Sequence, residues 1–115
     1  MKSFKIVFPT GYQVLNVLDD NLDINIVIED ESVFFATLFT LLNVQKIMIQ
    51  DGDNYFWAVN MIIIEDLELQ TIRSVISKIL DAGCEESIFS RIGTIQTIFS
   101  KDSSFNTIQD MGGFH

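Results

Sequence analysis

The stretch VFFATLFTLL, residues 33–42, holds seven large apolar residues among ten and has only two threonines for polarity. In an extended chain, successive side chains point to opposite faces. Residues 33–39 then place apolar groups on both faces, with Phe35 on one and Phe34 on the other. A strand that is apolar on both faces is covered on both sides or lies inside its sheet. We therefore predict that residues 33–39 form the central strand of the core.

The segment before it, LDINIVI at residues 22–28, alternates strictly between two faces. One face would carry Leu22, Ile24, Ile26 and Ile28, and the other Asp23, Asn25 and Val27. This period of two predicts a half-buried strand. The polar residues EDES at 29–32 predict the turn that joins it to the central strand.

Three further segments have the composition of strands. FKIVF at residues 4–8 predicts a first strand, which Pro9 and Gly11 end in a turn. YQVLNVL at 12–18 predicts a short second strand. YFWAVNMIII at 55–64 predicts another strand that is apolar on both faces.

The last third of the chain predicts a hairpin and a tail. ESIFSRI at residues 86–92 and TIQTIFS at 94–100 are separated by Gly93, and we expect them to pair. Residues 102–115 are polar and contain glycine, so we expect a loosely ordered tail.

A short helix is predicted for LLNVQKIMIQ, residues 41–50. Thr40 is a suitable N-cap, and Asp51-Gly52-Asp53 supplies the stop. The stripe expected to be buried consists of Leu41, Val44 and Met48, with Leu42 and Ile49 beside them.

The strongest helical pattern is LELQTIRSVISKILDA, residues 67–82. Its apolar residues recur at intervals of three and four and are Leu69, Ile72, Val75, Ile76, Ile79 and Leu80. Asp66 is the expected N-cap, and Gly83 stands where a C-terminal cap belongs.

The order of these elements predicts an α+β fold. Strands come first, then a short helix, one long helix and more strand. We expect one domain over residues 1–115, with a single antiparallel or mixed sheet and one short and one long helix packed on it.

The chain is strongly acidic, with 16 Asp and Glu against 7 Lys and Arg and a net charge of −9 among 115 residues. Between Ile6 and Ile72 the only basic residue is Lys46. The same span holds Asp19, Asp20, Asp23, Glu29, Asp30, Glu31, Asp51, Asp53, Glu65, Asp66 and Glu68. Such a field repels nucleic acid and anionic membranes and attracts basic partners. Acidity can also serve solubility alone.

The sequence offers no set of residues for catalysis. The only histidine is the last residue, His115, and Cys84 has no internal histidine to activate it as a nucleophile. Asp51-Gly52-Asp53-Asn54 lacks the ligand spacing and the closing glutamate of a calcium loop. We therefore expect a binding protein without enzymatic activity, metal or cofactor.

Location follows from three features. One cysteine excludes an internal disulfide. No apolar run approaches the ~20 residues that span a membrane. The N-terminal MKSFKIVFPTGYQ has no long apolar segment followed by a small-residue cleavage site. We expect a cytoplasmic protein.

Two stretches resemble a group of small acidic bacterial proteins. They are DINIVIEDESVFFATLFTLLNVQKIM at 23–48 and YFWAVNMIIIEDLELQTIRSVISKIL at 55–80. The first is similar to an acidic turn followed by an aromatic strand with a "TFFTL-N-I" segment, and the second to "YFWA-DMIIVEDL" leading into a helix. Val59-Asn60 departs from the second pattern, which has an acidic residue before the Met-Ile run. Some proteins with these features resemble immunity proteins of polymorphic or contact-dependent growth-inhibition toxins.

The resemblance implies a chain that binds and neutralises a cognate toxin, which we expect to be a basic nuclease. The acids expected to form ion pairs with toxin Arg and Lys are Asp19, Asp20, Asp23, Glu29, Asp30, Glu31, Asp51, Asp53, Glu85 and Glu86. The alternative is an acidic structural or adaptor module that self-associates, as a homodimer, through a strand edge or an apolar patch. An enzyme that uses carboxylates alone, with or without a metal, is the third reading.

Overall fold

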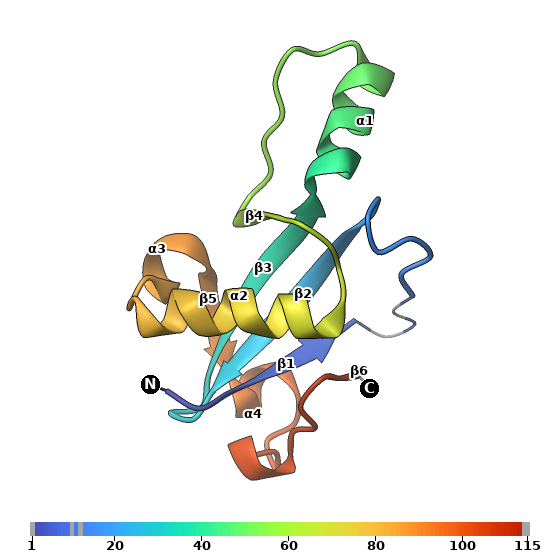
Figure 1. The fold of residues 1–115 in the computed structure, drawn as a ribbon. Helices are drawn as coiled ribbons and strands as arrows, with labels where there is room; N and C mark the ends of the chain where they lie inside the picture. Colours follow the sequence, from blue (N-terminus) through green and yellow to red (C-terminus); the bar gives the residue numbers. More distant parts are fainter. Residues whose placement is uncertain (1, 10, 12, 114–115) are drawn as a thin grey trace.

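The computed structural model describes residues 2–9, 11 and 13–113. Its centre is a mixed sheet with the strand order β4-β3-β2-β1-β6, and β5 pairs with β3 outside this path (Figure 1). The strands are β1 (Phe4–Phe8), β2 (Asn21–Ile28), β3 (Ser32–Thr40), β4 (Met61–Ile64), β5 (Ser90–Thr94) and β6 (Gly112–Gly113). Together with the helices, this sheet confirms the predicted α+β fold.

The prediction that residues 33–39 form the central strand is confirmed. β3 pairs with β2 along one edge in antiparallel register, from Asn21↔Phe39 to Val27↔Val33. Its other edge is shared, because β5 pairs with its first half and β4 runs parallel to its second half. Phe34 on one face is 1% exposed, and Val33 on the other is fully buried.

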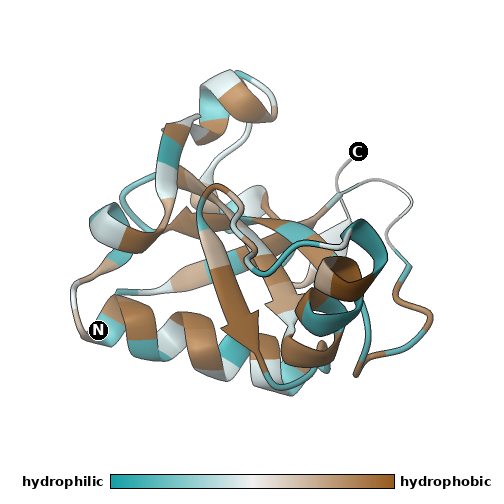
Figure 2. Ribbon diagram, turned by 90° about the horizontal axis from the view of Figure 1, so that it is seen from above, coloured by the Kyte–Doolittle hydropathy of each residue, from teal (hydrophilic) through white to brown (hydrophobic). Residues whose placement is uncertain are grey.

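Helices lie on both faces of this sheet and beyond its end (Figure 1). They are α1 (Leu41–Asp51), α2 (Leu69–Asp81), α3 (Glu85–Ile88) and α4 (Ile95–Ile98), with a 3-10 turn at Phe105–Thr107. α2 crosses one face and buries Ile72 and Ile76 in the main core (Figure 2). On the other face, Ile95 of α4 packs with Val27 and Val33 in a smaller core.

The helix ends follow local sequence rules. The Thr40 side chain accepts a hydrogen bond from the backbone N–H of Asn43, as predicted for the N-cap of α1. Gly83 has a positive φ of 71° and closes α2, with Cys84 N–H donating to the carbonyl of Ile79. This is a Schellman ending. Asp66, in contrast, precedes the cap.

The N-cap of α2 is Glu68, so the expected start at residue 67 is two residues early. The Asp66 carboxylate accepts the N–H of Glu68 at 2.9 Å and forms a turn before the helix.

One predicted strand does not form, and another is shorter than predicted. Residues 13–18 form turns and irregular chain instead of the short strand predicted at 12–18, and Tyr12 lies outside the described residues. Of the strand predicted at 55–64, only β4 forms. Asn60 has a φ of 54°, which turns the chain just before β4, so residues 55–60 cannot continue the strand.

The predicted late hairpin is also wrong. Only β5 is a strand, and it pairs with β3. The first segment of the predicted hairpin begins within α3. The second segment contains α4, because Thr94 and Thr97 form a reciprocal capping box that starts a helix at Ile95. One helical turn is enough to bury Ile95 completely against the second face of the sheet.

The described part of the C-terminal segment, residues 102–113, contacts the sheet. β6 pairs with β1 in parallel, and the Asp110 carboxylate accepts the N–H of Ile6 at 3.0 Å. The same carboxylate pairs with Arg73 of α2 at 2.7 Å. These contacts differ from the loose attachment that the polar composition suggests. Residues 114 and 115, including the only histidine, lie outside the described residues.

The stripe expected to be buried on α1 is buried only at Val44. Thr40 ends β3 and Leu41 starts α1 without a connecting loop, so the helix continues past the end of the sheet (Figure 1). Leu41 is therefore 65% exposed and Ile49 74% exposed.

Within the part of the chain that the structure describes, no helix has both the length and the apolar character needed to cross a membrane.

Candidate protein-binding surface

α1 and the loop that follows it, residues 41–60, project beyond the sheet, and we refer to them as the arm (Figure 1). The arm is connected to the sheet by β3 at one end and β4 at the other. Phe56 in the returning loop packs edge-on against Phe39 of β3, with 4.9 Å between ring centroids. This contact fixes the loop over the end of the sheet.

Thr40 anchors the base of the arm. It is completely buried, and its hydroxyl contacts the N–H of Asn43 at 3.2 Å and both the N–H and the carbonyl of Asp20 at 3.3 Å. Its own N–H donates to the same Asp20 carbonyl at 3.1 Å. One residue thereby fastens α1 to the chain that enters β2.

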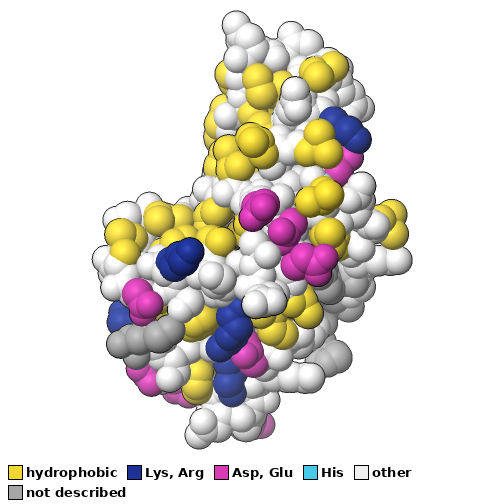
Figure 3. Space-filling view, in the orientation of Figure 1, with side chains coloured by type: hydrophobic (Ala, Val, Ile, Leu, Met, Phe, Trp, Pro, Cys, Tyr) yellow, Lys and Arg dark blue, Asp and Glu magenta, His cyan; other side chains and the backbone are white. Residues whose placement is uncertain are grey.

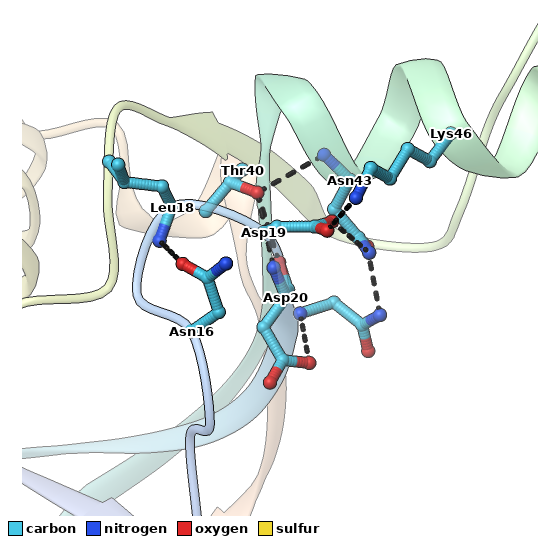
Figure 4. Close-up of polar contacts among 8 residues, drawn as sticks. Asn16, Leu18, Asp19, Asp20, Thr40, Asn43 and Lys46 are labelled. Carbon is cyan, nitrogen blue, oxygen red and sulfur yellow. Dashed lines mark hydrogen bonds and ion pairs between the residues drawn. The ribbon is translucent and has the colours of Figure 1, made fainter.

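A second set of polar contacts braces the same junction (Figure 4). The Asp19 carboxylate accepts hydrogen bonds from the Nζ of Lys46 and from the side-chain amide of Asn43. Bonding to Lys46 holds the pKa of Asp19 below its ordinary value. Asp19, one of the expected partner contacts, is thus occupied inside the chain and only 15% exposed.

The arm carries large apolar side chains that face solvent. The most exposed of them, at 41% or more, are Leu41, Leu42, Ile49, Tyr55, Trp57 and Val59. In Figure 3, hydrophobic side chains gather on the upper part of the molecule that the arm forms. Aromatic side chains in such positions are the usual anchors of protein interfaces.

One face of α1 is hollowed into a groove of about 490 Å³. It is lined by Leu41, Val44, Gln45, Met48, Ile49 and Asp53. The first five recur at helical spacing, and Leu41, Val44, Met48 and Ile49 among them belong to the stripe that was expected to face the core. An apolar groove on a projecting helix is suited to a partner's apolar side chains.

Acidic residues surround the base of the arm. β2 begins where β3 and β4 end, because β2 is antiparallel to β3 and β4 is parallel to it. A bond of 2.8 Å from Leu67 N–H to the Val17 carbonyl joins the segments before β2 and after β4. These segments and the start of β2 hold the acidic base, which consists of Asp19, Asp20, Asp23, Glu65, Asp66 and Glu68. Figure 3 shows acidic side chains gathered below the arm.

Most of the acidic base is available to a partner. Among the described residues, only Asp19 of this group forms an ion pair. Asp23 is exposed, and its carboxylate accepts the Thr37 hydroxyl at 3.0 Å, which holds it in place on the sheet. Asp51 and Asp53, also expected as contacts, are exposed at the tip of the arm. The structure therefore brings five of the ten expected acids to the arm or its base.

The other five lie at the opposite end of the sheet. Glu29, Asp30 and Glu31 form the β2–β3 turn, roughly 20 Å from the acidic base at about 3.4 Å per residue. Glu31 is engaged internally, accepting the Gln96 amide at 3.1 Å and the N–H of Phe105 at 3.3 Å. Hydrogen bonds from Ser32 lower the pKa of Asp30.

The two glutamates of α3 are paired in the same region. Glu85 is buried and forms an ion pair with Lys2, whose hydrogen bond lowers the pKa of Glu85. Glu86 pairs with Arg91 at 2.7 Å. The ten expected acids therefore form no single patch, and those at this end serve mainly internal contacts.

Sequence reasoning missed two groups at this surface. Glu65, Asp66 and Glu68 were noted as acids but were not expected to bind a partner. The apolar residues of the arm were assigned to the core. The departure from alternation at Asn60 and the absence of a loop between β3 and α1 were the available signals.

The described residues contain no group of three or more His, Cys, Asp or Glu side chains placed to hold a metal ion. Comparisons of the chain with protein-family models, with curated proteins and with solved structures found no match. The surface of the arm and its acidic base are therefore the candidate functional site.

Proposed function

We propose that this chain is an immunity protein, which binds a cognate toxin domain and neutralises it in the cytoplasm of the cell that makes both. The toxin domain in this proposal is a basic nuclease, and the chain itself has no catalytic activity. The observation that carries the proposal is the arm, an exposed apolar projection whose base carries six acids, of which only Asp19 forms an ion pair among the described residues.

The arm supports binding affinity. Trp57 is 70% exposed and Tyr55 is 61% exposed, although burial of aromatic side chains is strongly favourable. Large exposed apolar patches rimmed by polar residues mark interaction sites. A partner that covers these side chains supplies the burial that the fold leaves incomplete.

The acidic base supports the choice of partner. A nuclease carries a cationic cleft for phosphate, and an acidic surface attracts it over long range. The net charge of −9 speeds the encounter with such a partner and disfavours binding of this chain to nucleic acid. Charge then selects a basic protein, while the apolar arm fixes the orientation in which it is held.

Self-association is a second candidate, because the same exposed apolar arm is suited to a second copy of the chain. It predicts a stable homodimer in the absence of any toxin. The net charge of −9 on each copy opposes that assembly at low salt.

The experiment that tests the proposal uses the protein encoded by the adjacent gene, which the proposal requires to be a basic toxin. Its toxic activity is measured with and without a stoichiometric amount of this chain, and again with Ile49→Ala and Trp57→Ala. The proposal requires inhibition by the natural chain and weaker inhibition by both variants. Full toxic activity in the presence of this chain, or a homodimer that does not bind the toxin, would overturn the proposal.

A further inference from the structure

β4 is an edge strand whose outer side is open. It pairs in parallel with β3, and in the described residues it pairs with no second strand. Thr37 N–H donates to the Asn60 carbonyl at 3.1 Å, so Asn60, Ile62 and Ile64 direct their backbone groups toward β3. Met61 and Ile63 then direct their N–H and C=O groups outward, since backbone groups alternate along a strand.

The other edges of the sheet are protected against added strands. β5 carries Arg91 and has an extra residue, Ile92, opposite the step from Val33 to Phe34. β6 consists of two glycines. Charges, bulges and short edge strands are the devices that prevent edge pairing. β4, Met-Ile-Ile-Ile, is also short, with four residues, but it carries neither a charge nor a bulge.

A groove runs between β4 and α2. Its volume is about 420 Å³, and Ile63, Ile64, Glu65, Gln70, Thr71, Ser74, Val75 and Lys78 line it. Ile63 is 52% exposed. A groove between an edge strand and a helix is the arrangement that accepts an extended peptide by β-strand addition.

The charges beside β4 are mostly acidic: Lys78 of α2 also lines the groove, whereas three acids follow the strand. Glu65, Asp66 and Glu68 follow the strand directly, and none of them forms an ion pair among the residues described. A second copy would bring its own three acids and its charge of −9 to the same place. An extended segment with Lys or Arg near its end is the complementary occupant.

We infer that the basic partner adds an extended segment to the outer edge of β4, with its backbone bonded to Met61 and Ile63 and a cationic side chain beside Glu65. This inference rests on the proposed function and specifies how the partner is held. In this arrangement the arm contacts one side of the bound protein, and the partner's extended segment joins the sheet as a strand next to β4.

Amide hydrogen exchange on the full chain, alone and bound to the basic toxin that the proposed function requires in the adjacent gene, tests this inference. We expect the Met61 and Ile63 amides to exchange about tenfold more slowly, or slower still, in the complex. Arg91 on β5 is the internal control and should not change. If the two proteins bind but Met61 and Ile63 exchange at an unchanged rate, strand addition is wrong and the proposed function stands. If they do not bind, the proposed function fails first.

A substitution separates the backbone contact from the side chain. Ile63→Pro removes an outward N–H and leaves the bonds between β4 and β3, since proline is tolerated at the solvent side of an edge strand. It should weaken binding at least about tenfold, because the complex loses the uncharged hydrogen bond that the Ile63 N–H donates and the added segment packs less well against proline. Ile63→Thr keeps the N–H and is the matched control. Equal loss with both variants would assign the effect to the side chain and contradict strand addition.

A synthetic eight-residue peptide of alternating Lys and Val supplies an independent probe. It should slow exchange at Met61 and Ile63 and lose this effect at high salt. Its version with N-methylated backbone amides should not. Equal protection by both peptides would contradict backbone pairing.

Discussion

Thr40 joins β3, α1 and the chain that enters β2 through one buried hydroxyl. The capping role was predictable, because a threonine stood immediately before a helical pattern. Its bonds to Asp20 were not, since they link residues 20 positions apart and depend on the register of β2 against β3.

We predict that Thr40→Val destabilises the protein by about 1–3 kcal/mol, because it removes a helix cap and leaves the part-buried N–H groups of Asp20 and Asn43 without their acceptor. Thr40→Ser keeps the hydroxyl and should lose less. Urea denaturation of the three proteins measures the difference. A Val variant as stable as the Ser variant would show that the hydroxyl contributes nothing.

Glu85 is the second residue with a clear consequence. Its pKa is lowered in the folded chain, chiefly by the hydrogen bond from Lys2, whose own pKa is raised. A lowered carboxyl pKa stabilises the fold above the ordinary value of 4.5, and this contribution is lost as pH falls through the folded pKa. The raised Lys2 pKa adds stability below 10.5, which is lost at higher pH.

We therefore expect the urea midpoint of the natural chain to fall as pH is lowered from 5 toward 3. Glu85→Gln should be less stable at pH 7 and should show a shallower decline over this range. Glu86→Gln, whose carboxylate lies on the surface, is the matched control. An unchanged slope in Glu85→Gln would contradict the assignment.

At the scale of elements, the buried face of α2 was predictable, whereas the exposure of α1 was not. The periodicity of α2 placed Ile72, Ile76 and Leu80 on one face, and all three are buried. α1 has a similar apolar stripe, yet it extends past the sheet because no loop separates it from β3. Periodicity predicts which residues share a face. It does not say whether another element covers that face.

The buried face of α2 gives a direct stability prediction. Ile76 is fully buried against the sheet. Ile76→Ala should cost about 2–5 kcal/mol, the range for large-to-small substitutions in a core. Ser74→Ala, on the exposed side of the same helix, should change stability by about 0.5 kcal/mol or less. Thermal and urea denaturation measure the stability of the two variants. Equal losses of stability would contradict the packing of α2 against the sheet.

The arm gives the opposite prediction. Ile49→Ala removes a side chain that is 74% exposed, so stability should change by about 0.5 kcal/mol or less. Affinity for the basic partner should fall about tenfold, because buried anchors dominate interface energies. Ile92→Ala is the matched control, an exposed isoleucine on β5 at the other end of β3. Urea denaturation measures the stability of the two variants, and calorimetric titration measures their affinity for the partner. Equal affinities of Ile49→Ala and Ile92→Ala would exclude the arm as the binding surface.

At the scale of the whole molecule, charge was predictable in amount but not in placement. The sequence shows 16 acids, yet only three-dimensional pairing brings Glu65, Asp66 and Glu68 to the same end as Asp19, Asp20 and Asp23. The same pairing places the 29–31 turn far away. The late hairpin and the strand at 12–18 failed for a related reason, since short apolar segments are decided by what they pack against.

The acidic base and the arm make separate contributions to binding. Charge acts before contact and speeds association, whereas buried apolar side chains act after contact and slow dissociation. The account as a whole depends on both being present in one complex.

Stopped-flow measurement of the association rate with the basic partner, from about 0.05 to 0.5 M salt, tests this most directly. We predict a rate that falls by about tenfold or more as salt rises, together with a faster dissociation rate, but an unchanged association rate, for Ile49→Ala. A salt-independent association rate, or a chain that forms only homodimers and does not bind the partner, would contradict the account.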